Sequence, residues 1–118
     1  MVSELRDVRD FLGRHAPFSA LPGDALDRLP RSVSVRYLRR GSEFPPAEAD
    51  LASFHVIRKG AVELRDDAGE LVEKLAEGDC LDSSAAAARN QEKLVGMTVE
   101  DTLVYVLPSA LLDELRND

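Results

Sequence analysis

The hydrophobic and polar positions between residues 54 and 82 form a succession of short strand-like runs and turns, with clear alternation around Val62 and Leu64. Gly60 stands where a first strand-like run must reverse, and residues 67–69 supply a second turn before the run 71–75. Gly78 and Asp79 mark a third turn. The segment 83–88, which contains four consecutive alanines, has the composition of a short helix. This pattern predicts an antiparallel meander followed by a short helix, and the rest of the chain is organised around it.

The segment 3–15 has the pattern of an amphipathic helix. Ser3 is placed to cap its start, and Gly13 lies near its end. Its apolar stripe consists of residues at helical spacing: Leu5, Val8, Phe11 and Leu12. The stripe packs either on the domain itself or on a partner or second copy, and we favour packing on the domain.

Two further elements are predicted before the meander. Residues 24–29 form a short helix that Pro30 ends. Residues 32–38 have the alternating pattern of a half-buried strand. One face of that strand carries Val33, Val35 and Tyr37, and the other carries Ser32, Ser34 and Arg36.

After the meander, residues 94–98 and 102–107 predict two more strands, and 109–116 predict a final helix behind Pro108. We therefore expect one domain over residues 1–118, with a barrel at 32–107 between the helices 3–15 and 109–116. Because the last helix stands at the end of the sequence, we expect it to lead into further domains of a longer protein.

Composition narrows the classes of function. The 118 residues carry a net charge of -7, and 44% of them are hydrophobic. An acidic chain of this kind does not suit nucleic acid, because neutralising phosphates needs clustered Lys and Arg. No apolar run approaches the roughly 20 residues of a membrane helix. The single cysteine, Cys80, permits no internal disulfide, which suits the cytoplasm.

Catalytic and metal chemistry find little support in the sequence. The two histidines, His15 and His55, lie in different segments, whereas a metal enzyme on a β-barrel needs several ligands that converge. We interpret His55 as a packing residue within a strand and Cys80 as an inert, buried thiol. We therefore expect no enzyme activity, no metal and no resident cofactor.

The order of these signals resembles the cyclic nucleotide-binding domain family, the sensor fold of the catabolite activator protein and of protein kinase A regulatory subunits. The resemblance covers about residues 11–115. The residues that carry it are Phe18 and Leu21, the strand with Val33 and Val35, residues 41–43, 54–62, Gly69, 75–79 and 100–108, and the leucine-rich helix at the end.

The resemblance implies a mainly β fold, an eight-stranded jelly-roll barrel (a double-stranded β-helix) with α-helices flanking it at both ends. It also implies a regulatory domain that senses a cyclic nucleotide or another small anionic ligand. The sequence is most similar to the amino-terminal sensor of bacterial signal-transduction proteins that continue into paired CBS modules and a nucleotidyltransferase-like domain.

The family's phosphate-binding cassette is degenerate here. It resembles Phe-Gly-Glu-Leu-Ala-Leu followed by Pro-Arg-Ala-Ala, in which helix amides and the arginine hold the phosphate. Aligned without gaps, Leu81, Asp82 and Ser83 take the positions of Phe, Gly and Glu. Glu92 takes the position of the arginine. Two like charges about 6 Å apart at an effective dielectric of about 20 repel by roughly 3 kcal/mol, so Glu92 opposes a phosphate.

Three interpretations follow for this site. A register shift would bring Arg89 or Lys93 into the arginine's place and allow a cyclic nucleotide to bind; a different small ligand is the second interpretation. The ligand-contacting candidates are Leu81, Asp82, Ser83, Ser84, Arg89 and Lys93. The third is a scaffold of the same fold without a ligand, which docks other domains or forms a homodimer through the helix 3–15 and the leucines of 111–115.

Overall fold

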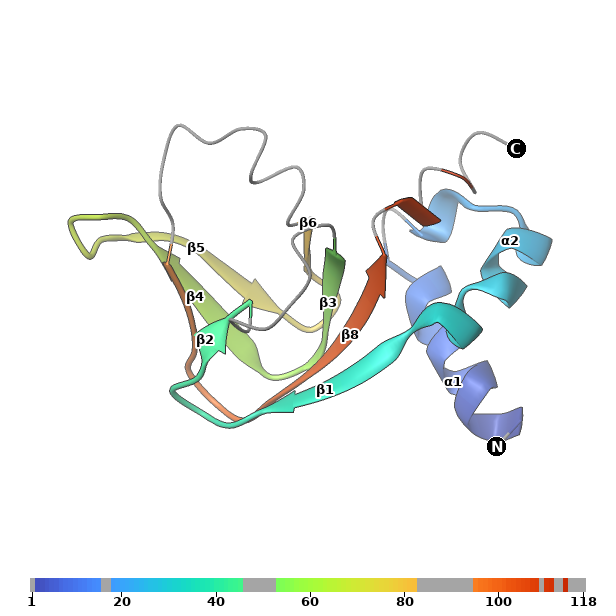
Figure 1. Ribbon diagram of the computed structural model, residues 1–118, viewed down its shortest axis with the longest axis horizontal. Coiled ribbons are helices and arrows are strands. Elements are labelled where there is room, and N and C mark those ends of the chain that lie inside the picture. Colours follow the sequence, from blue (N-terminus) through green and yellow to red (C-terminus); the bar gives the residue numbers. More distant parts are fainter. Residues whose placement is uncertain are drawn as a thin grey trace.

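The computed structural model describes residues 2–15, 18–45, 53–82, 95–108, 110–111 and 114. Its helices gather at one end of the long axis and its strands fill the rest (Figure 1). The helical elements are α1 (Val2–Gly13), η1 (Phe18–Ala20), α2 (Gly23–Arg28) and η2 (Pro30–Ser32), of which η1 and η2 are 3-10 helices. The strands are β1 (Ser34–Leu38), β2 (Glu43–Phe44), β3 (Ser53–Lys59), β4 (Ala61–Arg65), β5 (Leu71–Ala76), β6 (Cys80–Asp82), β7 (Val95–Thr98) and β8 (Thr102–Pro108).

The strands of the described ranges form two antiparallel sheets. The β3 sheet has the order β1-β8-β3-β6, and the β4 sheet has the order β2-β7-β4-β5. The hairpin between β3 and β4 joins the two sheets, and β4 and β5 pair antiparallel as the next step of the meander. The mainly β prediction is therefore confirmed, and the predicted meander passes from one sheet to the other.

Two hydrophobic clusters lie on opposite faces of the β3 sheet. The helical core lies between this sheet and the helices and consists of Phe11, Leu12, Phe18, Leu21, Ala25, Leu26, Leu29, Phe54, Val56, Tyr105 and Leu107. The inter-sheet core lies between the two sheets and consists of Leu38, Phe44, Ile57, Val62, Leu64, Leu75 and Val104. Since successive side chains of a strand point to opposite faces, β3 contributes alternately to both cores.

The reversal between β3 and β4 depends on Gly60. Its φ is +112°, and a Cβ at this position would lie 2.5 Å from Oγ1 of Thr102. The turn between β4 and β5 is held differently, because the Asp66 carboxylate accepts hydrogen bonds from the backbone amides of Ala68 and Glu70, each 2.9 Å long. Both turns stand where the glycines and aspartates of the sequence predicted them.

The helix predicted for 3–15 is α1, and its apolar stripe packs on the domain. Phe11 and Leu12 are buried in the helical core, and Val8 packs against that core. Only Leu5 remains largely exposed, at 42%. Ser3 lies inside the helix, which begins at Val2, so the expectation that Ser3 caps it is wrong.

The predicted face of β1 is wrong. Val35 and Tyr37 were expected on the buried face, but they are 55% and 60% exposed, while Arg36 is half-buried. The physical reason is that the helices cover only part of the outer face of the β3 sheet and leave its edge strand β1 uncovered at Val35 and Tyr37. Its inner face is the one that carries Leu38 of the inter-sheet core, and Arg36 lies two residues before Leu38 on that face. Val33, just before β1, packs on the helical core.

Some predictions lie outside the described residues or were missed. The short helix 83–88 lies outside them, and of the final helix 109–116 only residues 110, 111 and 114 are described, all helical. Leu111 packs against the helical core. The sequence did not predict β2 and β6 as separate strands. Among the described segments, no helix has the length and apolar character needed to cross a membrane.

Candidate functional site

The predicted cassette belongs to the chain between β6 and β7, so the flanking strands define where the candidate site lies. β6 pairs with β3 such that Leu81 stands opposite His55 and Asp82 opposite Phe54. Directly opposed residues of an antiparallel pair share one face of the sheet. Leu81 therefore shares its face with His55, and it packs, half-buried, against the inter-sheet core.

Of the predicted ligand-contacting residues, the structure places Leu81 beside the inter-sheet core. For Asp82 it gives the backbone position at the end of β6. The remaining candidates, Ser83, Ser84, Arg89 and Lys93, lie outside the described residues, as does Glu92. The described residues that border the proposed site lie on the inner face of β1, β8, β3 and β6, which we call the wall.

His55 is the polar residue at the centre of this wall. Its side chain is fully buried, and its ring meets the Phe44 ring edge-on at a centroid distance of 5.5 Å. Burial lowers the pKa of His55 below its usual 6.5, and the charge of Arg36 lowers it further. The imidazole is therefore neutral at pH 7. It packs within its strand, as the sequence analysis expected.

Arg36 brings a positive charge to the same region. It stands opposite Val104 of the inter-sheet core in the ladder of β1 and β8, so its half-buried side chain projects from the inner face of the sheet. Sequence reasoning missed this residue because it assigned the apolar side chains of β1 to the buried face. Residues two apart on a strand share a face, so Arg36 lies on the same face as Leu38. Starting from Leu38 rather than from Val35 would have placed Arg36 on the inner face of the sheet.

The β1–β2 turn and the β7–β8 turn are fastened to each other at the far end of this wall. Asp101 accepts a hydrogen bond from the backbone amide of Arg40 at 2.9 Å and another from the Tyr37 hydroxyl. These bonds lower the pKa of Asp101, the backbone bond more than the hydroxyl bond, and the bond to Asp101 raises the pKa of Tyr37. The Thr98 hydroxyl donates to the Arg39 carbonyl at 2.7 Å.

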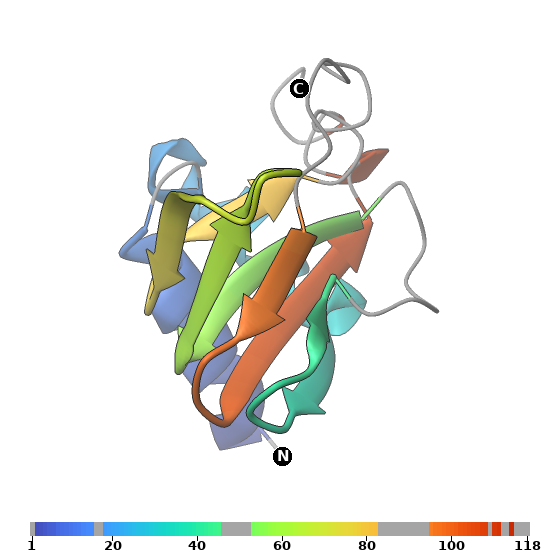
Figure 2. The ribbon, with the colours of Figure 1, turned by 90° about the vertical axis from the view of Figure 1, so that its left-hand side faces the viewer.

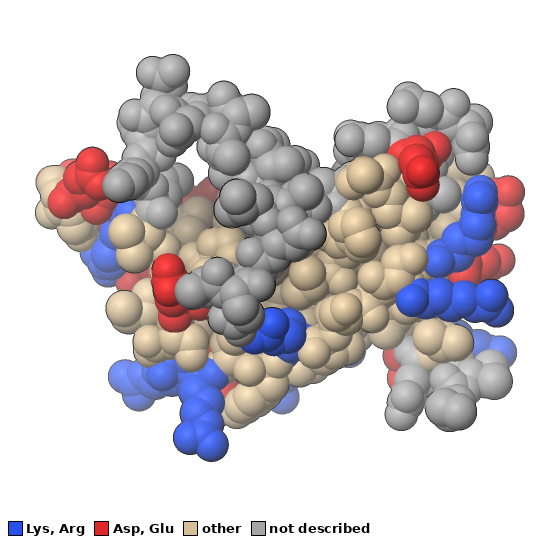
Figure 3. Space-filling view, in the orientation of Figure 1, with Lys and Arg blue, Asp and Glu red and all other residues tan. Residues whose placement is uncertain are grey.

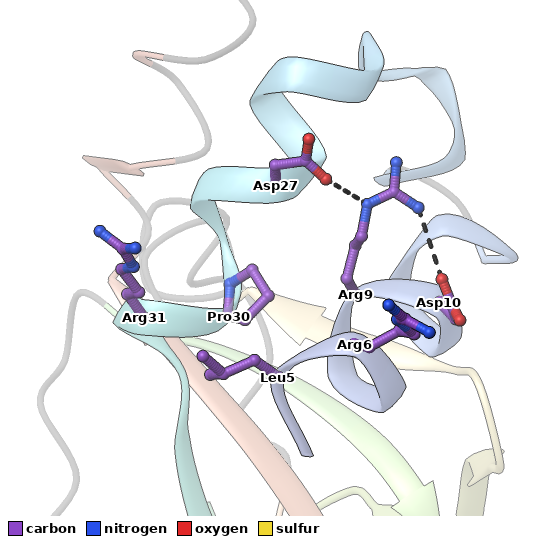
Figure 4. A pocket seen from close by; sticks show the side chains of 7 residues that line it. All are labelled: Leu5, Arg6, Arg9, Asp10, Asp27, Pro30 and Arg31. Carbon is purple, nitrogen blue, oxygen red and sulfur yellow. Dashed lines mark hydrogen bonds and ion pairs between the residues drawn. The ribbon is translucent and has the colours of Figure 1, made fainter. Parts of the chain in front are cut away.

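A hollow at the helical end lies apart from this candidate site. It is an open groove of about 380 Å³ between α1 and the segment of α2 and η2, lined by Leu5, Arg6, Arg9, Asp10, Asp27, Pro30 and Arg31 (Figure 4). Arg9 bonds Asp27 across the groove and Asp10 at 3.4 Å. The bond to Asp27 is the main reason that the pKa of Arg9 is raised.

The paired charges in this groove hold α1 against α2. Figure 3 shows basic and acidic side chains next to one another at the helical end, which fits such pairing. Within the described ranges, no three His, Cys, Asp or Glu side chains come together as a metal ion would require.

Comparison with known proteins gives information on the fold. No model of a known protein family matches the sequence, and no curated protein matches it. Solved structures do match. The regulatory domain of Toxoplasma gondii protein kinase A with cAMP has a TM-score of 0.77 and 13% identity, and the match covers 96% of this chain and 44% of that one.

Two further solved structures also match. The sensor domain of the transcriptional regulator DNR from Pseudomonas aeruginosa has a TM-score of 0.76 and 14% identity, over 93% of this chain and 80% of that one. The regulatory subunit of a cAMP-independent protein kinase A from Trypanosoma cruzi, bound to guanosine, has a TM-score of 0.72 and 16% identity, over 98% and 46%.

These matches show that the chain has the fold of cyclic nucleotide-binding regulatory and sensor domains. The chain spans about half the length of several proteins that it matches, between 40% and 54%. The identities, all at or below 23%, speak for the fold alone.

Proposed function

We propose that this chain is a regulatory, non-catalytic sensor domain of the cyclic nucleotide-binding type with a degenerate phosphate-binding cassette. The observation that carries the proposal is the fold, because its structural neighbours are regulatory and sensor domains. The ligand site of the proposal lies between the two sheets, next to the segment 83–94. The described residues on its wall are Leu81, the neutral His55 and the positively charged Arg36.

The ligand of the proposal is a small anion or a nucleoside. Leu81, Asp82, Ser83 and Ser84 would line it, and Arg89 or Lys93 would replace the cassette arginine. For a phosphate, the repulsion by Glu92 must be overcome by one of these cations. A nucleoside carries no such charge, and the Trypanosoma cruzi neighbour with guanosine makes this second ligand class specific enough to test.

We also propose the architecture of the domain and of the protein that contains it. Residues 1–118 form one domain with a closed, eight-stranded jelly-roll barrel, in a cytoplasmic bacterial signal-transduction protein that continues into CBS and nucleotidyltransferase-like domains. Ligand binding shifts the population of positions of the helix 109–116, which requires a ligand that prefers one position. The contact of Leu111 with the helical core supports this route, because that core contains residues of α1 and β3.

Thermal unfolding in the presence of cyclic AMP, cyclic GMP, guanosine and linear nucleotides tests the proposal. A ligand at about one hundred times its dissociation constant stabilises the folded state by about 2.7 kcal/mol. For a domain of this size, that is a rise in Tm of several degrees. We expect at least one cyclic nucleotide or nucleoside to give this rise.

Variants separate the ligand classes. Either Arg89→Ala or Lys93→Ala should abolish the rise in Tm with a cyclic nucleotide. Both variants should keep a rise in Tm with guanosine. Arg40→Ala, an exposed arginine on the β1–β2 turn, is the matched control and should respond as the wild type does. An unchanged Tm with every compound would contradict the sensor proposal.

The scaffold of the same fold is the second candidate, and one observation favours it. Leu5 is 42% exposed at the groove between α1 and α2, whereas the other residues of the α1 stripe pack in or against the helical core. In this second proposal, Leu5 and the leucines that the sequence places at 111–115 would dock an attached domain. A chain that binds no ligand, and whose longer parent protein loses its domain contacts on Leu5→Asp, would be such a scaffold.

A further inference from the structure

The outer face of the β4 sheet carries apolar side chains that no described element covers. In Figure 2, β2, β7, β4 and β5 face the viewer, and the helices lie behind the other sheet. Val95 and Met97 on β7 are 57% and 50% exposed, and Leu71 on β5 is 51% exposed. Apolar residues in neighbouring positions of an open sheet are typical of a contact surface.

The strand register arranges this face in two rows. Val62 and Leu64 point into the inter-sheet core, so Glu63 and Arg65 point outward. In the first row Glu63 stands opposite Met97 of β7 on one side and Lys74 of β5 on the other. In the second row Arg65 stands opposite Val95 and, after a shift in register, opposite Leu71. We call the surface of these six residues the two-row face.

Two strands of the two-row face, β7 and β4, are complementary to themselves when reversed, whereas β5 carries Lys74 in one row and Leu71 in the other. β7 offers two apolar residues, Met97 and Val95. β4 offers one acid and one base, Glu63 and Arg65, which lie 2.7 Å apart as an ion pair within the chain. A two-fold axis that crosses the strands between the rows exchanges the first row with the second. It would place Met97 on Val95 of a second copy and Glu63 on Arg65 of that copy.

We propose that the two-row face binds a second copy of this chain, sheet against sheet. The charge pattern argues for a second copy rather than an unrelated partner, because an isologous interface needs a surface that complements itself. The 7 or so Å between the rows is the spacing of residues two apart on a strand. The same two-fold axis sets the Lys74 stem over Leu71 of the other copy, with its ammonium group at the rim. Formation of this dimer requires no ligand.

The size of the face sets the strength of the dimer. Three strands about 4.8 Å apart and about five residues long cover only on the order of 200 Å² in projection. Stable complexes bury about 800 Å² on each partner. The dimer is therefore weak and depends on concentration, and measurements must extend to about 1 mM.

Sedimentation equilibrium of the 118-residue chain tests the surface with a matched pair of variants. The average mass of the wild type should rise from 13.0 kDa towards twice that value as concentration increases. Val95→Asp should remain at the monomer mass. Val35→Asp, on β1 of the other sheet and exposed to the same extent, should associate like the wild type. A wild type that stays monomeric, or equal association of both variants, would overturn the proposal.

A charge exchange tests the geometry of the two-fold axis. Glu63→Arg alone places arginines on arginines and should abolish association. Adding Arg65→Glu to it restores an acid in one row and a base in the other, so the double variant should associate as the wild type does. Both variants change only exposed or half-buried positions of one strand. Failure of the double variant to recover, with its circular dichroism unchanged, would overturn this arrangement.

Discussion

At the scale of residues, His55 makes the stability of the fold depend on pH. Burial lowers the pKa of its imidazole in the folded state, and Arg36 lowers it further, whereas in the unfolded chain the pKa returns to about 6.5. Below pH 6.5 the unfolded state therefore binds a proton that the folded state does not. Stability is full above pH 6.5 and falls as the pH decreases from there towards the folded-state pKa.

We predict that the free energy of unfolding of the wild type is level between pH 7 and 8 and decreases below pH 6.5. Because a single imidazole is involved, about 1.4 kcal/mol per pH unit is the upper limit of this slope. Urea unfolding at a series of pH values measures it. In His55→Gln the slope between pH 6.5 and 5 should disappear, while His15→Gln, which changes the other histidine, should keep it. A slope that follows His15 instead would contradict this origin.

Gly60 and Gly69 have the same kind of backbone conformation in different surroundings. Both have positive φ, +112° and +82°, but a Cβ on Gly69 would meet no atom within 4 Å, whereas one on Gly60 would meet Thr102. The two positions thus separate backbone strain from steric overlap.

We predict that Gly69→Ala costs about 1 kcal/mol, the strain of a left-handed alanine. Gly60→Ala should cost about 3 kcal/mol, because overlap with Thr102 is added to that strain. Chemical denaturation of both variants measures the difference. Equal losses would mean that the β7–β8 turn moves away from Gly60 without cost.

At the scale of elements, α1 is part of the domain and not an appendage. Phe11 contacts the Tyr105 ring edge-on at 5.8 Å, and the Arg58 guanidinium lies over the Phe11 ring at 4.4 Å. At the end of α1, His15 packs so close to Gly78 that a Cβ there would lie 2.4 Å from the imidazole. The helix is thus attached to β8, to β3 and to the turn that leads into β6.

We predict that Leu12→Ala lowers the stability of the whole domain by about 3 kcal/mol, because it leaves a cavity in the helical core. Tm should fall by roughly 10 °C. Leu5→Ala, in the same helix but 42% exposed, should change stability by less than about 0.5 kcal/mol. If Leu12→Ala melts the helix and leaves the sheets at the wild-type Tm, α1 is not part of the cooperative unit.

Elements with several periods of pattern were predictable, and very short ones were not. α1 and the hairpin around Gly60 carry repeated apolar positions and a turn glycine, and both are found. β2 and β6 are only 2 and 3 residues long, too short for alternation to appear. β1 alternates clearly, but alternation does not say which face is inside. Partial cover by the helices decided that for Val35 and Tyr37.

At the scale of the whole molecule, the fold and the ligand differ in how they are encoded. The fold rests on many weak signals, such as the turn glycines and the alternating strands, and their joint order predicted it. A ligand site rests on a few charges. Glu92, which the gapless alignment proposes for the cassette, and Arg36 on the inner face of β1 are single charges, and one substitution at either would leave the hydrophobic pattern untouched. Sequence pattern therefore predicts this architecture far better than its chemistry.

The position of β3 between two cores has a consequence for how such a domain diverges. Phe54 and Val56 fill the helical core, and Ile57 fills the inter-sheet core. A change of volume on either face must be matched by a neighbour from a different layer of the molecule, so single substitutions there are seldom neutral. β1 and β5, by contrast, each contribute one buried residue to the inter-sheet core and none to the helical core. Lineages with this fold should therefore change faster at β1 and β5 than at β3, and β3 is the segment on which to align distant homologues.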